Sequence, residues 1–294
     1  MAKELKIGKH MIGEGHPVYI IAEIGINHNG DIEIAEKMIR AAKKAGVDAV
    51  KFQKRTPLLC VPPEERSKMR ETPWGYITYL EYREHVEFGK EEYTRIDDLC
   101  RELDIDWFAS VWDEEAIDFL EQFDPIAYKV PSAALTDNGL IDKLNATGRP
   151  IILSTGMSTM DEIRTAVSHF DIDRLAITHA TSAYPCKPEN LNLRMVPTLA
   201  KEFNCPVGYS GHETGLVPSA VAVGLGAQIV ERHFTLDRAM WGTDQGASVE
   251  PGGMEKLVKY IRVTELALGD GVKKVYDAEL PSREICAGIN KIYG

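Results

Sequence analysis

The feature that most constrains the fold of this chain is a strand-and-helix unit that repeats eight times. Each unit begins with a short apolar run, such as VYIIA at 18–22, which is typical of a strand buried on both faces of a parallel sheet. A helical pattern follows, as at 31–45, where Asp31 stands at its start and Gly46 in the position of a C-cap. Eight such units in 294 residues predict an α/β fold, the (β/α)8 TIM barrel. An open doubly wound sheet is the alternative.

The apolar runs and helical patterns give the bounds of the predicted elements. The strands are expected at 18–22, 49–52, 107–110, 127–130, 150–154, 175–179, 207–209 and 228–230. The helices are expected at 31–45, 91–103, 114–121, 138–146, 160–168, 190–202, 215–225 and 253–267.

Three segments fall outside the repeat, in what we expect to be one domain over 1–294. Residues 5–13 predict a short N-terminal hairpin. Residues 54–90 form a long, proline-containing insertion after the second strand, expected to be irregular and to overhang the barrel mouth as a substrate lid. The C-terminal tail, 268–294, is too weakly patterned for another domain and is expected to pack on the barrel or on a neighbouring subunit.

Charge and hydropathy exclude several classes of partner. Acidic residues outnumber basic ones by 45 to 34, a net charge of −11, which argues against nucleic acid or an anionic membrane as the main partner. No apolar run approaches the ~20 residues that cross a bilayer, and the N-terminus lacks a signal peptide's apolar core. We therefore expect a cytoplasmic protein that acts on small molecules.

Two histidines stand just after the last two predicted strands. His212 follows VGYSG and His233 ends IVERH, so both side chains are expected in the barrel mouth, where they could bind one divalent metal ion. Glu231 lies on the same side of its strand as His233 and is expected to orient a ligand or a metal-bound water. In the alternative, each histidine ends its strand and hydrogen bonds to backbone.

Two lysines lie within apolar strands, Lys51 in DAVKFQ and Lys129 in IAYKVPSA. A buried ammonium group is costly unless it meets a negative charge. With the hydroxyl groups of Ser132, Ser154 and Ser210, the lysines could cradle the phosphate and carboxylate of one small molecule. The alternative pairs each lysine with an internal Glu or Asp.

The motifs of the chain resemble those of a known family. AEIGINHNG, VKFQ, YKVPSA, LSTGMS, VGYSGH, VERHFT and GTDQ stand in the order and at about the spacing seen in the sialic acid synthase family, and the resemblance covers roughly residues 16–283. Members of that family condense phosphoenolpyruvate with an aldose to a 2-keto-3-deoxy sugar acid and release phosphate. The resemblance implies the same reaction here, a homodimer, and a divalent metal cofactor, commonly Mn2+, with Mg2+ or Co2+ as alternatives.

The resemblance also implies roles for particular residues. Positions that bind phosphoenolpyruvate match Lys51, Ser110, Lys129, Ser132, Ser154 and Ser210. The metal ligands match His212 and His233. Positions around the acceptor sugar and the reacting carbonyl match Glu23, Tyr184 and Asp244, to which the strand position of Glu231 adds a fourth candidate catalytic residue.

Three departures from the family pattern leave the acceptor open. The chain is expected to lack the antifreeze-like C-terminal domain, which places an arginine on the acceptor in well-understood members. Ser182 stands where asparagine is usual, and Gln245 where histidine often follows the aspartate. The acceptor could be N-acetylmannosamine-like, another amino sugar or an unmodified aldose, with or without a phosphate.

Two other functions compete with the synthase. One is a catalytically silent accessory barrel that binds phosphoenolpyruvate or a sugar acid. The other is a metal-dependent hydrolase on the same fold, which would need an HxH pair on the first strand, where this chain has Asn27-His28-Asn29.

Overall fold

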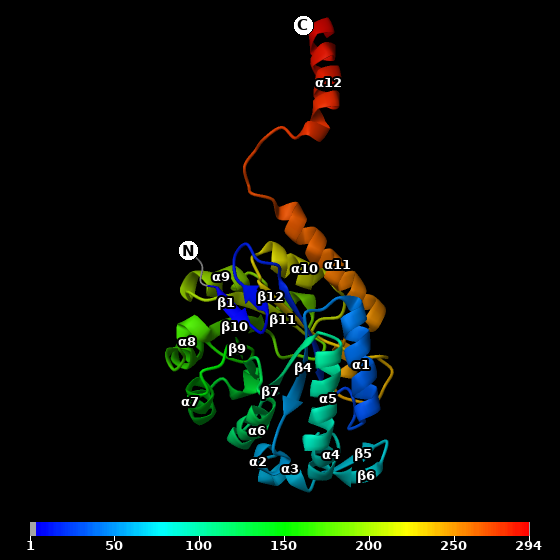
Figure 1. The fold of residues 1–294 in the computed structure, drawn as a ribbon, viewed down its shortest axis with the longest axis vertical. Coiled ribbons are helices and arrows are strands. Elements are labelled where there is room, and N and C mark those ends of the chain that lie inside the picture. Colours follow the sequence, from blue (N-terminus) through cyan, green and yellow to red (C-terminus); the bar gives the residue numbers. More distant parts are fainter. Residues whose placement is uncertain (1–3, 294) are drawn as a thin grey trace.

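The computed structural model describes residues 4–293, with side chains to residue 286, and its centre is a closed barrel of eight parallel strands (Figure 1). The strands follow one another around the barrel in chain order, and the last pairs with the first. This confirms the predicted (β/α)8 TIM barrel. The strands are β3 (Tyr19–Gly25), β4 (Ala49–Lys54), β7 (Asp106–Val111), β8 (Tyr128–Val130), β9 (Ile151–Ser154), β10 (Leu175–Ala180), β11 (Val207–Gly211) and β12 (Ile229–His233).

Helices between the strands cover the outside of the barrel (Figure 1). They are α1 (Ile32–Ala45), α5 (Lys90–Glu102), α6 (Glu114–Leu120), α7 (Asn138–Ala146), α8 (Met160–Ser168), α9 (Met195–Glu202), α10 (Val217–Gly224) and α11 (Pro251–Leu268). The predicted ends of the first helix hold: the Asp31 carboxylate accepts from two backbone N–H groups, and Gly46 is left-handed with φ 86°. The helix predicted at 190–202 instead begins at Met195, because Asn192 is left-handed (φ 45°) and interrupts the turn before it.

The barrel interior has an apolar layer near the N-terminal ends of the strands. Tyr19 and Ile21 of β3 pack there with inward side chains of the other strands, such as Phe108. The hairpin of β1 (Leu5–Ile7) and β2 (His10–Ile12) packs three buried aliphatic side chains onto this layer and so closes that end of the barrel. The predicted N-terminal hairpin is therefore present. Because side chains alternate along a strand, the next inward positions form a second layer, which is polar.

The insertion after β4 is ordered, so our expectation of an irregular segment was wrong. It contains α2 (Pro57–Cys60), α3 (Pro63–Arg66), β5 (Met69–Thr72), β6 (Gly75–Thr78) and α4 (Tyr79–His85). These elements are too short to show a clear period in the sequence. Trp74 and Tyr82 pack edge-on against Trp241, with ring centres 5.5 and 5.3 Å away. These contacts join the insertion to the segment that follows β12.

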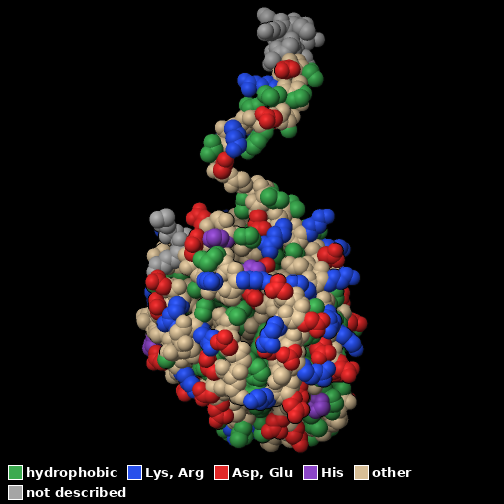
Figure 2. All heavy atoms as spheres, in the orientation of Figure 1, with side chains coloured by type: hydrophobic (Ala, Val, Ile, Leu, Met, Phe, Trp, Pro, Cys, Tyr) green, Lys and Arg blue, Asp and Glu red, His purple; other side chains and the backbone are tan. Residues whose placement is uncertain are grey.

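The C-terminal tail was predicted to pack on the barrel or on a neighbouring subunit, and in its described residues it extends away from the barrel, so packing on a neighbouring subunit stays a prediction. Gly269 and Gly271 have positive φ and end α11, and α12 (Leu280–Tyr293) then extends away from the rest of the chain (Figure 1). Acidic and basic side chains are interspersed over the face of the molecule in Figure 2. No helix within the described residues is long and apolar enough to cross a membrane.

Candidate active site

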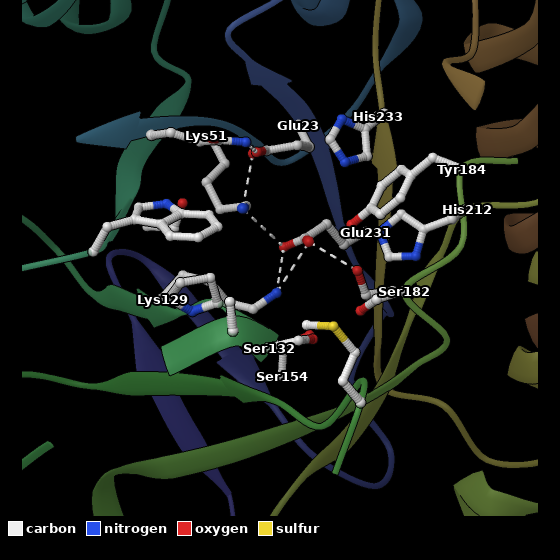
Figure 3. Close-up of a pocket in the computed structure, with 17 residues that line it drawn as sticks. Glu23, Lys51, Lys129, Ser132, Ser154, Ser182, Tyr184, His212, Glu231 and His233 are labelled. Atoms are coloured by element: carbon white, nitrogen blue, oxygen red, sulfur yellow. Dashed lines mark hydrogen bonds and ion pairs between the residues drawn. The ribbon is translucent and has the colours of Figure 1, made fainter. Parts of the chain in front are cut away.

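The polar layer of the barrel interior lies at the C-terminal ends of the strands and lines a cavity of about 220 Å³ (Figure 3). Strand register sets its order, because paired residues on neighbouring parallel strands lie side by side. Ser210 pairs with Glu231, and His233 pairs with Glu23. The predicted residues that line the cavity are Glu23, Lys51, Ser110, Lys129, Ser132, Ser154, Tyr184, Ser210, His212, Glu231 and His233.

Two lysines and two glutamates form a buried ion-pair cluster at the centre of the cavity (Figure 3). Lys129 Nζ donates to Glu231 Oε1 and Oε2 at 3.0 and 2.9 Å. Lys51 Nζ lies 2.8 Å from Glu23 Oε2 and 3.6 Å from Glu231 Oε2. The alternative in which internal carboxylates pair with the lysines is therefore what the structure contains. The cluster carries two positive and two negative charges and is balanced without a ligand.

Burial and charge act in opposite directions on this cluster. Burial would lower the pKa of Lys51, but Glu23 and Glu231 outweigh it and hold that pKa above the usual value. Burial lowers the pKa of Lys129, and the like charge of Lys51 adds to this. Burial would raise the pKa of Glu231, but Lys129 and Lys51 hold it well below the usual range. Glu231 is therefore an anion at neutral pH.

A glycine next to Glu23 sets the position of its carboxylate. Gly25 has φ 56°, and the register between β3 and β4 shifts between Glu23 and Gly25. A Cβ at Gly25 would come within 3.1 Å of both Glu23 Oε1 and Gln53 Nε2. Those two atoms are hydrogen bonded at 3.0 Å. The bulge therefore lets Gln53 hold one oxygen of Glu23 while Lys51 holds the other.

The two histidines lie side by side on the cavity wall, with ring centres 5.5 Å apart. His212 Nδ1 is 3.0 Å from the Thr181 carbonyl oxygen, which can only accept, so Nδ1 carries the proton and Nε2 is left with its lone pair. Burial, followed by the neighbouring His233, lowers the pKa of His212 to about 3, so the ring is neutral at pH 7. His233 Nδ1 is buried without a hydrogen-bond partner.

This histidine pair fits a divalent metal ion. Two imidazole nitrogens bound ~2.1 Å from one ion place their ring centres roughly 5 Å apart, close to the spacing of His212 and His233. A buried ring nitrogen without a partner, as in His233, suits a missing ligand. Within the described residues no group of three or more His, Cys, Asp or Glu is placed to hold a metal. Water and substrate oxygens would have to complete the shell.

Glu231 was predicted to orient a ligand or a metal-bound water, and that role stays a prediction. Its oxygens accept from Lys129 and, at 2.9 Å, from the Ser210 hydroxyl. Like His233, Glu231 points into the barrel, but it lies one inward position deeper on β12, level with the lysines.

Two serines leave a donor for a ligand. The Ser132 hydroxyl accepts from Gly156 N–H at 3.0 Å, and the Ser154 hydroxyl accepts from Thr178 at 3.3 Å, so neither uses its own proton in these bonds. Ser110 has only a long bond, 3.4 Å, to the Phe52 carbonyl. These hydroxyls face the cavity around the lysines, as a cradle for an anion requires.

The residues named for the acceptor fall into two groups. Tyr184 lies against the histidines, 4.3 Å from His212 and 5.7 Å from His233 between ring centres, and Ser182 also lines the cavity. Asp244 lies outside the cavity lining, with Oδ2 4.0 Å from His233 Nδ1. Gln245 is buried and points elsewhere: Nε2 donates to the Asn27 carbonyl at 3.0 Å, and Oε1 accepts from Thr235. Gln245 therefore joins the loop that contains Asn27 to the segment that contains Thr235, and it does not face the cavity in which the acceptor sugar would bind.

Sequence reasoning gave no role to five further residues of the lining: Gln53, Trp112, Pro131, Ala133 and Met157. Gln53 stands two residues after Lys51 on the same strand, so the period of two places it at the same strand end as Lys51. Trp112 follows strand β7 directly. Met157 has φ 60°, a left-handed conformation that its sequence does not reveal.

A TIM barrel whose strands end in paired lysines and glutamates beside two adjacent histidines has the layout of an enzyme active site. The chain belongs to the NeuB family, whose model matches residues 38–273. This confirms the resemblance to the sialic acid synthases.

Individual relatives agree with the family. The chain is 39% identical over 278 residues to the N-acetylneuraminate-9-phosphate synthase of Mus musculus, covering 93% of this chain and 77% of that protein. It is 36% identical to the N,N'-diacetyllegionaminic acid synthase of Legionella pneumophila (93% and 79% covered) and 35% identical to the pseudaminic acid synthase of Campylobacter jejuni (90% and 79%). The crystal structure of a sialic acid synthetase from Leptospira borgpetersenii superposes with a TM-score of 0.87 at 30% identity, covering 97% of this chain and 96% of that one.

Proposed function

We propose that this protein condenses phosphoenolpyruvate with the aldehyde of an open-chain aldose to give a nonulosonic-type 2-keto-3-deoxy sugar acid and inorganic phosphate. The observation that carries the proposal is the juxtaposition, in one cavity, of a buried lysine pair and a pair of adjacent histidines. The first suits a small anion and the second suits a metal. Relatives named as synthases of N-acetylneuraminate 9-phosphate, diacetyllegionaminic acid and pseudaminic acid support the same class of product.

Phosphoenolpyruvate would bind at the lysines and serines. An ammonium group has three donors, and Lys129 makes two hydrogen bonds to Glu231, so it keeps a donor for an incoming oxygen. Hydroxyl protons of Ser132 and Ser154 add neutral donors. Because the cluster is already balanced in charge, the bound anion must share the lysines with Glu231. Glu231 then keeps Lys129 in place between turnovers.

The acceptor aldehyde would lie at the histidines, under the ring of Tyr184. His212 and His233 would hold the divalent ion, for which Mn2+ is our first choice with Mg2+ and Co2+ as alternatives, and which when bound supplies Lewis-acid polarisation of the aldehyde. The barrel mouth holds both substrates in attack geometry. C3 of phosphoenolpyruvate then attacks the aldehyde carbon, and the aldehyde oxygen becomes a hydroxyl group.

The attack leaves positive charge at C2 of the former phosphoenolpyruvate, and water adds there. Glu23 would orient and deprotonate this water, and the contacts of its carboxylate with Gln53 and Lys51 at the edge of the cluster support that role. Cleavage of the C2–O bond then releases phosphate and leaves the keto group. One phosphoenolpyruvate, one aldose and one water yield one sugar acid and one phosphate. A homodimer, a cytoplasmic location and the choice of metal stay predictions.

The proposal is tested by phosphate release from phosphoenolpyruvate with Mn2+ across a panel of aldoses: mannose, N-acetylmannosamine, their 6-phosphates and arabinose. We expect release that depends on an aldose and that both Lys129→Ala and His233→Ala abolish. His16→Ala, which changes a histidine outside the cavity, is the control that keeps activity. Aldose-independent release, or release that survives both substitutions, would overturn the proposal.

A further inference from the structure

We propose that Arg55 and Arg83 form an anion subsite beside the cavity mouth that takes the phosphate of a phosphorylated aldose. This rests on the proposed function and narrows its acceptor. Arg55 follows β4, and Arg83 lies on α4 of the insertion. Neither belongs to the lysine and histidine clusters of the cavity.

The first observation is a group of buried N–H donors without partners. Among the described side chains, Arg55 Nε, Arg83 Nη2 and Trp112 Nε1 are buried and make no hydrogen bond. The Arg55 guanidinium stacks on the Trp112 ring, 3.7 Å from its centre. Arg83 is close enough to Arg55 for its charge to be felt there. Buried donors of this kind are normally satisfied, so the partnerless donors of the stacked Arg55 and Trp112, together with that of Arg83, point to a missing acceptor.

The second observation is a local excess of positive charge. Two carboxylates lie beside this segment, Glu87 and Asp113. Lys54 Nζ pairs with Glu87 at 2.8 Å, and Arg55 reaches Glu87 only through its backbone N–H at 3.1 Å. Asp113 accepts from Thr56 and from the backbone N–H of Ala116. Within the described residues neither Arg55 nor Arg83 has a carboxylate ion pair. Burial, followed by the charge of Arg83, lowers the pKa of Arg55 to about 10. An anion bound between the two arginines would offset both the cost of burying the Arg55 charge and its repulsion from Arg83.

The third observation is the position relative to the cavity. Arg55 Nη2 donates to Gln53 Oε1 at 2.5 Å, and Gln53 Nε2 donates to Glu23 at 3.0 Å. Gln53 and Trp112 themselves line the cavity. A ligand group at Arg55 would therefore lie beside the candidate catalytic carboxylate, on the side of the insertion. A guanidinium pair matches the oxygens of a phosphate, which can accept two forked donors.

The test compares the two acceptor forms on the same enzyme. Initial rates with phosphoenolpyruvate and Mn2+ give kcat/KM for N-acetylmannosamine and for its 6-phosphate, and likewise for mannose and mannose 6-phosphate. We expect the wild-type protein to prefer the phosphorylated member of a pair, and Arg83→Gln to lower that preference roughly 10- to 100-fold. The ratio is measured on one preparation, so any loss of folded protein cancels. Arg83→Lys should retain part of the preference.

The control is Arg70→Gln, which removes an exposed arginine of the same insertion and should leave the ratio unchanged. A wild-type protein without a preference for phosphorylated sugars, or a preference that survives Arg83→Gln, would overturn the subsite while leaving the proposed function intact. A rise in the KM for phosphoenolpyruvate that is equal with both sugars would assign the arginines to that substrate and overturn it too. No condensation with any sugar, together with equal binding of mannose and mannose 6-phosphate by calorimetry, would overturn both proposals.

Discussion

Lys129 Nζ donates to both oxygens of Glu231, at 2.9 and 3.0 Å, with the two side chains 2% and 6% exposed. The lysine that the proposed function assigns to phosphoenolpyruvate is thus held by an internal carboxylate before any substrate arrives. If the ammonium group had no partner in this place, burial would lower its pKa or the side chain would move toward water. The pair therefore keeps a charged lysine inside the barrel, and stability and substrate binding depend on the same contact.

Removing one member of this pair should destabilise the ligand-free protein. Lys129→Met leaves Glu231 with Ser210 and with Lys51 at 3.6 Å, and we expect a loss of about 3–5 kcal/mol in the free energy of unfolding. The double variant Lys129→Met/Glu231→Leu should recover most of that loss, because no charge of the pair is left without its partner. Urea unfolding at pH 7, followed by circular dichroism, measures both. A single variant within about 1 kcal/mol of wild type would contradict this reading.

Ser132 should contribute to phosphoenolpyruvate binding through its free hydroxyl proton. Ser132→Ala removes one neutral donor, which is expected to weaken binding about 3- to 10-fold. Ser158→Ala is the matched control on a neighbouring loop, since Ser158 donates to the Gly156 carbonyl and lies outside the cavity lining. Quenching of tryptophan fluorescence can report binding, because Trp112 lines the cavity. If both substitutions changed the affinity for phosphoenolpyruvate equally, Ser132 would serve only as a hydrogen-bond acceptor for the Gly156 backbone N–H.

Metal removal should stop the reaction reversibly. With two histidines as the protein ligands, we expect the ion to be lost to a chelator during dialysis and activity to return on adding Mn2+. Titration followed by the electron paramagnetic resonance of free Mn2+ should show weaker binding to His212→Gln and His233→Gln than to wild type. Full activity that resists prolonged chelation would count against a metal at this pair.

Stability should fall as pH is lowered from neutrality, partly because of His28. Burial lowers the pKa of His28 to about 3, against 6.5 for the ordinary side chain, so the unfolded chain binds its proton first. The contribution of neutral His28 to the free energy of unfolding is fully present above about pH 6.5 and is lost as the pH falls toward 3. Between pH 6.5 and 5 the loss amounts to about 2 kcal/mol. His28→Asn, which keeps an acceptor for Gly30 N–H, should flatten the pH dependence of the urea midpoint. An unchanged slope would mean that His28 is not the group responsible.

The barrel and most of the cavity could be predicted from sequence because both follow from simple periods. Apolar runs mark the eight strands of the barrel, and the period of two places Lys51 and Glu231 on the inner face near the strand ends. The insertion could not be read in this way, since its short elements depend on tertiary contacts such as Trp74 on Trp241. The partners of the lysines also escaped prediction, because they come from strands distant in the chain.

Side-chain direction after a strand was the other limit. Asp244 and Gln245 are neighbours in one motif, yet the first approaches His233 while the second turns inward to Asn27 and Thr235. No period applies in such a loop, so a motif alone could not separate their roles. The orphan donors at Arg55 and Arg83 likewise arise from the packing of the insertion.

The central claim is that carbon–carbon bond formation accompanies phosphate release by cleavage of the C–O bond. The direct measurement is to run the reaction in water enriched in oxygen-18, with phosphoenolpyruvate, Mn2+ and the best acceptor, and to weigh both products by mass spectrometry. The account predicts unlabelled phosphate in one-to-one ratio with a coupled 2-keto acid that carries the label at C2, read at early times before the keto oxygen exchanges with solvent. Label in the phosphate, or phosphate without a coupled acid, would contradict it.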